Sequence, residues 1–168
     1  MPISRLKEIL DGKNIRYVIV SHSTAYTAAA IAAMTHTPGK EIAKSVMVLV
    51  DGALAMVVVP GSKHVDLGAL KRLLGATEVL LAHEHQFAHV FPDCEVGAMP
   101  PFGNLYSLPV YVDQTLSEDE EIAFNAGSHR ELLRMAYSDY RDLVNPQVMD
   151  VVAANAAMRL TQRKAANF

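Results

Sequence analysis

Three segments of the chain hold residues that could do chemistry. Lys44 comes directly before the apolar run 45–50, and because an unpaired buried lysine is costly, we expect it at the rim of a sheet beside any site formed there. The segment 96–103 holds two prolines, which fix φ and remove N–H donors, and two glycines, which permit close approach. Such a rigid loop, with few but fixed N–H groups, could grip a small polar group. His129 and Arg130 follow Asn125 and Gly127, and a turn explains the Asn and the Gly but needs neither His nor Arg.

Each segment also has a plainer interpretation. Lys44 could be an exposed lysine at the start of a strand, residues 96–103 a rigid connector, and His129 a structural turn residue. Local pattern alone does not choose between these interpretations and a functional one.

Two further candidates for chemistry are weaker. His85 and His89 would lie one turn apart on a helix and could share a metal, but His83 would lie on the opposite side, which favours solvated surface histidines. Cys94 could be a nucleophile only with a lowered pKa, and its two acidic neighbours would raise that pKa instead. The sequence therefore predicts no metal site and a passive thiol.

The elements that must position these residues follow an α/β pattern. Two Val-rich runs, 45–50 and 53–59, flank Asp51-Gly52, which is a strong hairpin signal. Both runs are nearly continuous in apolar character, so we expect this hairpin to be central and covered on both faces. Helices are predicted at 2–13, 28–34, 65–74, 83–90, 139–143 (capped by Ser138) and 147–164; strands at 15–20, 78–81, 110–113 and 122–124; and either at 131–135. The predicted fold is a single α/β domain, a mixed β-sheet with a central β-hairpin flanked by helices.

Composition narrows the class of protein. The chain has 168 residues, 51% of them apolar and 20% charged, which excludes disorder and suits one domain. A single cysteine and no long apolar run favour a reduced, cytoplasmic protein without membrane partners. The net charge of −3 argues against bulk phosphate binding, so no DNA partner is expected and any contact with RNA must be local. Beyond Asp150 the charges are all basic (Arg159, Arg163, Lys164), which suits either a helix end or contact with a substrate phosphate.

The order and spacing of these motifs resemble the YbaK/prolyl-tRNA synthetase editing-domain family. The resemblance covers about residues 1–145 and leaves 146–168 as an appended C-terminal helix or tail. Its motifs are a lysine that opens a strand, an apolar Asp-Gly hairpin, a V-D-L helix start followed by L-G-A, a G-x-x-x-P loop and a late Gly-x-His turn. Here these are Ala43-Lys44-Ser45, 46–59, Val65-Asp66-Leu67 with Leu74-Gly75-Ala76, Gly97 to Pro101, and Gly127-Ser128-His129.

This resemblance implies a free-standing, metal-independent deacylase without a cofactor, which cleaves the ester of mischarged aminoacyl-tRNA; in this family the tRNA is often that for proline. Lys44 would hold the terminal phosphate or adenosine, and His129 would bind the amine or carbonyl or order a water. The loop backbone would hold the aminoacyl group and polarise its carbonyl. The residues predicted to bind substrate are Tyr26, Thr27, Gly97, Ala98, Met99, Pro100, Pro101 and Ser128. The segment 22–27 and the apolar loop 97–101 depart from the founding bacterial members, so the resemblance does not identify the amino acid removed.

Two other functions stay open at this point. A protein of the same fold could bind an aminoacyl-adenylate-like ligand or the tRNA end without hydrolysis, and a histidine-bound metal could support a different hydrolase. In the deacylase interpretation, the partner is the 3′ acceptor end of aminoacyl-tRNA. Because the chain is acidic, an aminoacyl-tRNA synthetase or an elongation factor could supply part of the affinity.

Overall fold

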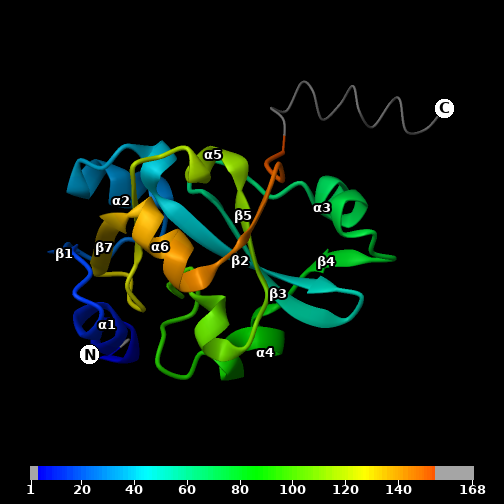
Figure 1. Ribbon diagram of the computed structural model, residues 1–168, viewed down its shortest axis with the longest axis horizontal. Helices are drawn as coiled ribbons and strands as arrows, with labels where there is room; N and C mark the ends of the chain where they lie inside the picture. The colour runs from blue at the N-terminus through cyan, green and yellow to red at the C-terminus, as the bar shows by residue number, and fades with distance from the viewer. Residues whose placement is uncertain (1–3, 154–168) are drawn as a thin grey trace.

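The computed structural model describes residues 4–153, and a five-stranded mixed sheet forms its centre (Figure 1). The strand order is β4-β2-β3-β5-β8, with β2 antiparallel to β4 and β3, and β5 parallel to β3 and β8. Its strands are β2 (Ala43–Val50), β3 (Ala53–Pro60), β4 (Val79–Leu81), β5 (Val110–Asp113) and β8 (Gln147–Met149). The predicted α/β class, with a mixed sheet around a central hairpin, is confirmed.

The β2–β3 hairpin has the turn that its sequence predicts. Asp51 and Gly52 both have positive φ, 49° and 84°, as a two-residue hairpin loop that matches the strand twist requires. One face of the hairpin, with Met47 and Met56, packs in the main core, and the other, with Val48, packs in a second apolar cluster. The hairpin is therefore covered on both faces.

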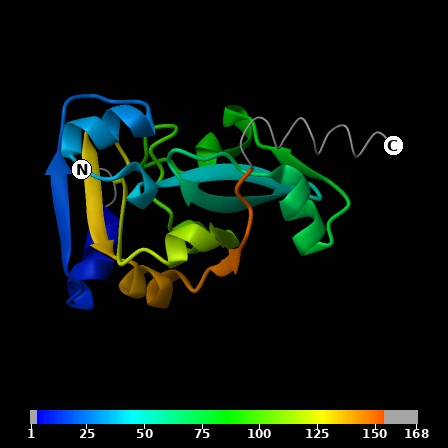
Figure 2. The same ribbon diagram turned by 90° about the horizontal axis from the view of Figure 1, so that it is seen from above.

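A second, antiparallel sheet of three strands takes the order β1-β7-β6, where a single sheet was predicted. These strands are β1 (Tyr17–Ser21), β6 (Glu121–Asn125) and β7 (Glu131–Ala136). Figure 2 shows β1 (blue) and β7 (yellow) running across the direction of the teal hairpin. The two sheets meet at a parallel bridge between Ile42 and Ala123, and both supply side chains to the main core.

Short helices pack around the two sheets. The α-helices are α1 (Ser4–Gly12), α2 (Ala28–Thr35), α3 (Leu67–Leu74), α4 (Glu84–Phe87), α5 (Gln114–Ser117) and α6 (Tyr137–Val144). The 3-10 helices are η1 (Gly39–Glu41), η2 (Ala88–Val90) and η3 (Gly103–Tyr106). Asp66 caps α3 through a hydrogen bond from the Ala69 N–H. Ser138, the predicted cap of the helix over 139–143, lies inside α6, whose N-cap is Ala136.

The predicted helix over 147–164 is wrong at its start, because Gln147–Met149 forms the edge strand β8. Tertiary pairing overrides the local helical pattern here: β8 lies along β5, and the Val151 N–H donates to the buried Asp113 carboxylate at 3.0 Å. The rest of that prediction, with Arg159, Arg163 and Lys164, lies outside the described residues.

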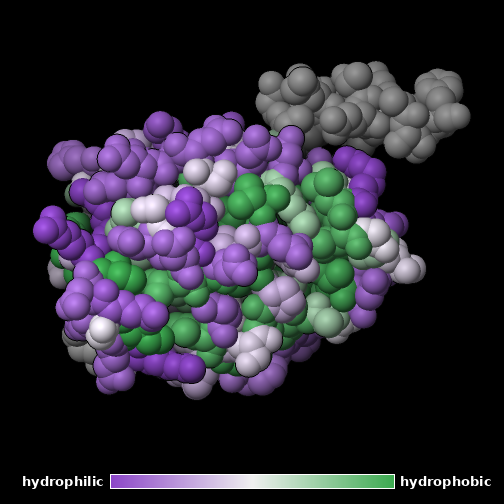
Figure 3. Space-filling view, in the orientation of Figure 1, coloured by the Kyte–Doolittle hydropathy of each residue, from purple (hydrophilic) through white to green (hydrophobic). Residues whose placement is uncertain are grey.

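The surface carries some large apolar side chains. Leu73 on α3 and Leu80 and Leu81 on the edge strand β4 are about half exposed, and Figure 3 shows apolar surface over α3. β4 has only three residues, and short edge strands limit pairing between molecules. Within residues 4–153, none of the helices is long and apolar enough to cross a membrane.

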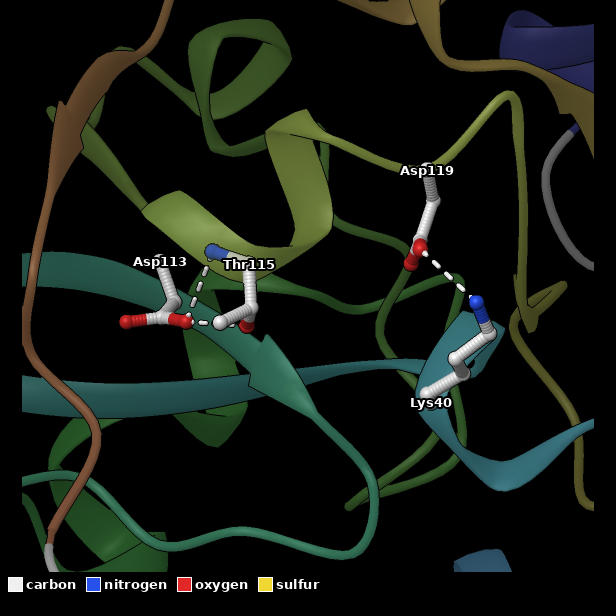
Figure 4. Close-up of polar contacts among 4 residues, drawn as sticks. All are labelled: Lys40, Asp113, Thr115 and Asp119. Carbon is white, nitrogen blue, oxygen red and sulfur yellow. Dashed lines mark hydrogen bonds and ion pairs between the residues drawn. The ribbon is translucent and has the colours of Figure 1, made fainter.

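Asp113 is the buried charge on which the end of the sheet depends. The residue is fully buried; one carboxylate oxygen accepts from Val151, and the other accepts from the Thr115 N–H at 3.1 Å and from the Thr115 hydroxyl (Figure 4). It therefore both caps α5 and holds the segment that follows β8.

We predict that Asp113→Ala lowers the free energy of unfolding by about 3 kcal/mol, because a charge-assisted hydrogen bond is lost and a buried N–H is left without a partner. Asp66→Ala, which removes an ordinary helix cap, is the matched control and should cost about 1 kcal/mol. Urea denaturation followed by circular dichroism measures both. A loss for Asp113→Ala no larger than that for Asp66→Ala would contradict this role.

Candidate functional site

A small cleft lies where the two sheets meet. Its volume is about 60 Å³, and its walls come from α2, the start of β2, the end of β6 and the loop before η3. The lining residues are Tyr26, Ala28, Ile31, Ile42, Ala43, Lys44, Ser45, Gly97, Met99 and Asn125. Four of the predicted site residues therefore meet in one cavity: Tyr26, Lys44, Gly97 and Met99.

Lys44 brings the cationic group to this cleft. It pairs with Val59 in the hairpin register, and its Nζ donates to the backbone carbonyl of Lys63 at 2.8 Å. The side chain is half-buried, and this desolvation lowers the pKa of the Lys44 ammonium below its ordinary value. Because the Lys44 ammonium makes a single hydrogen bond to the described residues 4–153, it has donors left for an anionic or carbonyl ligand.

The glycine-proline loop and the late turn are tied together by backbone hydrogen bonds. The Glu95 N–H donates to the Gly127 carbonyl at 2.8 Å, and the Gly127 N–H donates to the Ala98 carbonyl at 3.0 Å. The His129 N–H donates to a Glu95 carboxylate oxygen at 3.1 Å. Gly127 has φ of +85°, which only glycine adopts readily, so the turn needs this residue.

The His129 ring contacts the backbone of the loop and is not among the residues that line the cleft. Its ring Nε2 is 2.9 Å from the Val96 carbonyl, so Nε2 carries the hydrogen and donates, since a carbonyl oxygen only accepts. The ring is 7% exposed and stacks at a tilt on Tyr26, with ring centroids 4.7 Å apart. Its Nδ1 is buried without a hydrogen-bond partner among the described residues. The His129 ring therefore contacts the backbone just before Gly97, and its predicted catalytic role stays a prediction.

Gly97 presents to the cleft an N–H that a ligand could readily take. It is exposed with φ of +83°, and its N–H points to the thioether sulfur of Met99 at 3.3 Å, a weak acceptor. A Cβ at this position would make only ordinary contact with the His129 ring, at 3.6 Å, so the conformation favours glycine more than the space does. A carbonyl oxygen in the cleft would be a stronger acceptor than the sulfur.

The remaining predicted residues lie around the cleft without lining it. Thr27 caps α2, where its hydroxyl accepts from the Ala30 N–H at 3.1 Å. Ala98, Pro100 and Pro101 are buried residues of the glycine-proline loop itself. The Pro101 carbonyl accepts a hydrogen bond from the hydroxyl of Tyr140. Ser128 is buried in the turn, where its hydroxyl accepts from the Arg130 N–H.

Two polar residues of the cleft were not predicted from the sequence as site residues. Ser45 Oγ and Asn125 Oδ1 are buried in the cleft wall and have no hydrogen-bond partner among the described residues. Ser45 was read only as part of the strand start, and Asn125 only as a turn residue. Neighbours in a strand face opposite sides, so nothing in the sequence placed Ser45 beside Lys44 in one cavity.

A larger groove and the histidines considered as metal ligands lie away from this cleft. A larger open groove of about 1060 Å³ runs along β1 and β7 and contains none of the predicted site residues. His83 caps α4, and its ring stacks on His85 at 5.7 Å. Within the described part of the chain, no group of three or more His, Cys, Asp or Glu residues could hold a metal ion.

The mixed α/β fold that holds this cleft has counterparts in known proteins. The family model for the aminoacyl-tRNA editing domain matches residues 22–143. The chain therefore belongs to the aminoacyl-tRNA editing domain family.

Individual relatives agree with this assignment. The chain is 24% identical over 151 residues to the multifunctional Ser/Thr-tRNA deacylase ProXp-y of Escherichia coli K12, covering 87% of this chain and 90% of that protein. Among solved structures, a candidate trans-editing enzyme for prolyl-tRNA synthetase superposes with a TM-score of 0.76 and 25% identity, covering 89% of this chain and 96% of the other. A hypothetical protein has the same fold, with a TM-score of 0.80 and 23% identity over 89% of this chain and all of the other.

Cys94 has a different environment from that of a nucleophile. Its Sγ lies 3.8 Å from the Tyr106 hydroxyl and 3.7 Å from an Asp93 carboxylate oxygen. Burial, above all, raises the pKa of the Cys94 thiol to about 11, and the Asp93 charge adds to this shift. The prediction of a passive thiol rested on the same neighbouring charge.

We predict that Cys94 reacts slowly with thiol reagents in the folded protein. With a pKa of about 11, about one thiol in a thousand is ionised at pH 8, against about a quarter for an ordinary cysteine. The rate of reaction with DTNB should therefore rise steeply from pH 8 to pH 10 in the native protein. Protein unfolded in urea is the control, and an equally fast reaction in the native state at pH 8 would contradict the raised pKa.

Proposed function

We propose that the chain hydrolyses the ester of mischarged aminoacyl-tRNA and acts as a free-standing editing protein. The observation that carries this proposal is the meeting of Lys44 with the Gly97 N–H in one small cleft. Membership of the editing-domain family and the likeness to a Ser/Thr-tRNA deacylase support it.

The two groups suit the two ends of an aminoacyl ester. The Lys44 ammonium would bind the phosphate of the terminal nucleotide. The Gly97 N–H would then leave the Met99 sulfur and donate to the ester carbonyl, whose oxygen becomes negative as water attacks its carbon. The carbon–oxygen bond to the ribose breaks, the ribose oxygen takes a proton, and the free amino acid and tRNA are released.

The chemistry needs no protein nucleophile in this proposal. An aminoacyl ester is already activated, so positioning of the ester, the water and the neighbouring ribose hydroxyl can supply a large part of the rate. Cys94 is held as a thiol, and the Nε2–H of His129 is engaged with the Val96 carbonyl. We propose that the reaction is also metal-independent.

The cleft favours a small amino acid with a polar side chain. A volume of about 60 Å³ is roughly that of two water molecules in the liquid, so the cleft has room for only a small side chain. Ser45 Oγ and Asn125 Oδ1 are unpaired within it, and buried polar atoms are normally hydrogen-bonded. A serine or threonine hydroxyl and the α-ammonium group would supply the missing partners. We therefore propose serine and threonine as the amino acids removed, as the name of the E. coli relative also suggests.

The comparisons and the charge of the chain also bear on which tRNA and which protein partner it uses. The likeness to a candidate trans-editing enzyme for prolyl-tRNA synthetase supports tRNA for proline as a substrate. With a net charge of −3, the chain offers little general attraction for RNA, so a synthetase or elongation factor would add affinity. The alternative function is a module that binds the same ligand without hydrolysing it.

We predict that Lys44→Ala folds normally but loses deacylation about 10- to 100-fold, because a charge-assisted contact worth about 1.5–3 kcal/mol is removed. The substrate is tRNA for proline mischarged with labelled serine (Ser-tRNA), and the release of labelled serine measures the rate of hydrolysis. Lys71→Ala, on the exposed last turn of α3, is the matched control and should retain the wild-type rate. Full activity in folded Lys44→Ala would remove Lys44 from the mechanism.

The same assay separates the alternative functions. Binding of charged tRNA without hydrolysis would support the binding module. Loss of activity in EDTA would show that a metal carries the chemistry, and a stable wild-type rate in EDTA is the expected result.

We predict that Ser45→Ala lowers the rate for Ser-tRNA about three- to ten-fold relative to the rate for Ala-tRNA, because only serine loses a hydrogen bond of about 1 kcal/mol. Measuring both substrates on each variant cancels effects of folding. Ser138→Ala, an exposed serine on α6 that lines neither this cleft nor a neighbouring cavity, serves as the control. An equal fall for Ser-tRNA and Ala-tRNA would show that Ser45 does not read the side chain.

A further inference from the structure

A second cavity adjoins the cleft and has no role in the mechanism above. Its volume is about 400 Å³, and it is lined by Lys40, Pro60, Ser62, Lys63, Thr115, Glu118 and Asp119. Lys44 Nζ donates to the Lys63 carbonyl, and Ala43 pairs with Pro60, so residues that line the cleft directly contact residues that line the second cavity. A molecule that extends past Lys44 therefore comes next to this second cavity.

The wall of the second cavity contains a carboxylate that lacks donors. The side chain of Asp119 is 10% exposed, and its Oδ1 lies 3.8 Å from Lys40 Nζ, a long ion pair (Figure 4). Its Oδ2 is buried and has no hydrogen-bond partner among the described residues. Burial raises the pKa of Asp119, and the nearby Lys40 ammonium opposes this shift. A hydroxyl group that donates to this carboxylate would satisfy it.

The rim of the cavity carries cations. Lys40 is 74% exposed, and Lys63 is also exposed, so both ammonium groups can reach a bound anion. Glu118 and Asp119 would repel a free inorganic anion, which makes a plain phosphate a poor ligand. A ligand that joins a hydroxyl to a phosphate suits both sets of groups, and a ribonucleotide has this chemistry.

We propose that this cavity seats the penultimate ribonucleotide of the tRNA acceptor strand. The Asp119 carboxylate accepts a hydrogen bond from the ribose 2′-hydroxyl, and Lys40 and Lys63 bind the flanking phosphates. The proposal rests on the proposed function, because that function places the terminal nucleotide at Lys44. The carboxylate also makes the site selective for RNA, since DNA lacks this hydroxyl.

The experiment measures binding of an uncharged RNA hairpin with the acceptor-stem sequence, by fluorescence anisotropy. The hairpin is made twice, once with ribose throughout and once with a 2′-deoxyribose at the penultimate nucleotide alone. For the wild-type protein we expect the deoxy change to weaken binding roughly ten-fold, as loss of one hydrogen bond to a charged group does. Asp119→Ala should bind the all-ribose hairpin about as weakly and lose nothing more with the deoxy hairpin.

Controls keep the result specific. Asp142→Ala, an exposed carboxylate on α6, should keep the full ten-fold difference. Asp119→Asn preserves shape if Asp119→Ala is unstable, and the hairpin comparison in the wild type needs no variant. Lys40→Ala and Lys63→Ala should each reduce the slope of log affinity against log salt by about 0.7, while Lys71→Ala leaves it unchanged.

Two results would overturn the proposal: no effect of the deoxy change on the wild type, or an equal effect on Asp119→Ala. Because the hairpin is uncharged, this test does not depend on hydrolysis. If deacylation fails but the penultimate hydroxyl is read through Asp119, the cavity stands and the hydrolytic function falls. If deacylation depends on Lys44 but the hydroxyl is not read, only the cavity's role falls.

Discussion

The site depends on the hydrogen bonds that tie the glycine-proline loop to the late turn. Glu95, Ala98 and Gly127 exchange backbone hydrogen bonds, and the His129 ring donates to the Val96 carbonyl. These bonds join segments about thirty residues apart and fix the backbone on both sides of Gly97. Because the donor of an oxyanion-type contact must be in place before the reaction, this rigidity is what gives the Gly97 N–H a possible catalytic use.

The junction of the two sheets places Lys44 in the same cleft as the Gly97 N–H. The bridge between Ile42 and Ala123 brings the start of β2 beside β6, so Lys44 and Ser45 face the same cleft as Asn125. The cleft is small, and Ser45 Oγ and Asn125 Oδ1 in its wall have no hydrogen-bond partner among the described residues. This site differs from the larger and more open groove along β1 and β7 in its small volume and in its two buried polar atoms without partners among the described residues. No reactive side chain marks the difference.

Much of this arrangement could be predicted from the sequence, because it depends on local chemistry. The Asp51-Gly52 turn, the apolar hairpin and the position of Lys44 at its start follow from turn geometry and burial costs. The division into two sheets, the strand at Gln147–Met149 and the roles of Ser45 and Asn125 depend on contacts between distant segments. His129 shows the same limit: the sequence singled it out, but only the Val96 contact shows that its ring supports the loop.

The environments of the reactive side chains agree with a mechanism based on positioning. Cys94 is held protonated by burial, the Nε2–H of His129 is already donated to a carbonyl, and Asp113 is committed to capping α5 and holding Val151. Among the described residues that line the cleft, the Lys44 ammonium, the Gly97 N–H, Ser45 Oγ and Asn125 Oδ1 have hydrogen-bonding capacity left. All of these bind and orient instead of forming covalent bonds. A fold that arranges its polar groups in this way suits a substrate that is already activated, as an aminoacyl ester is.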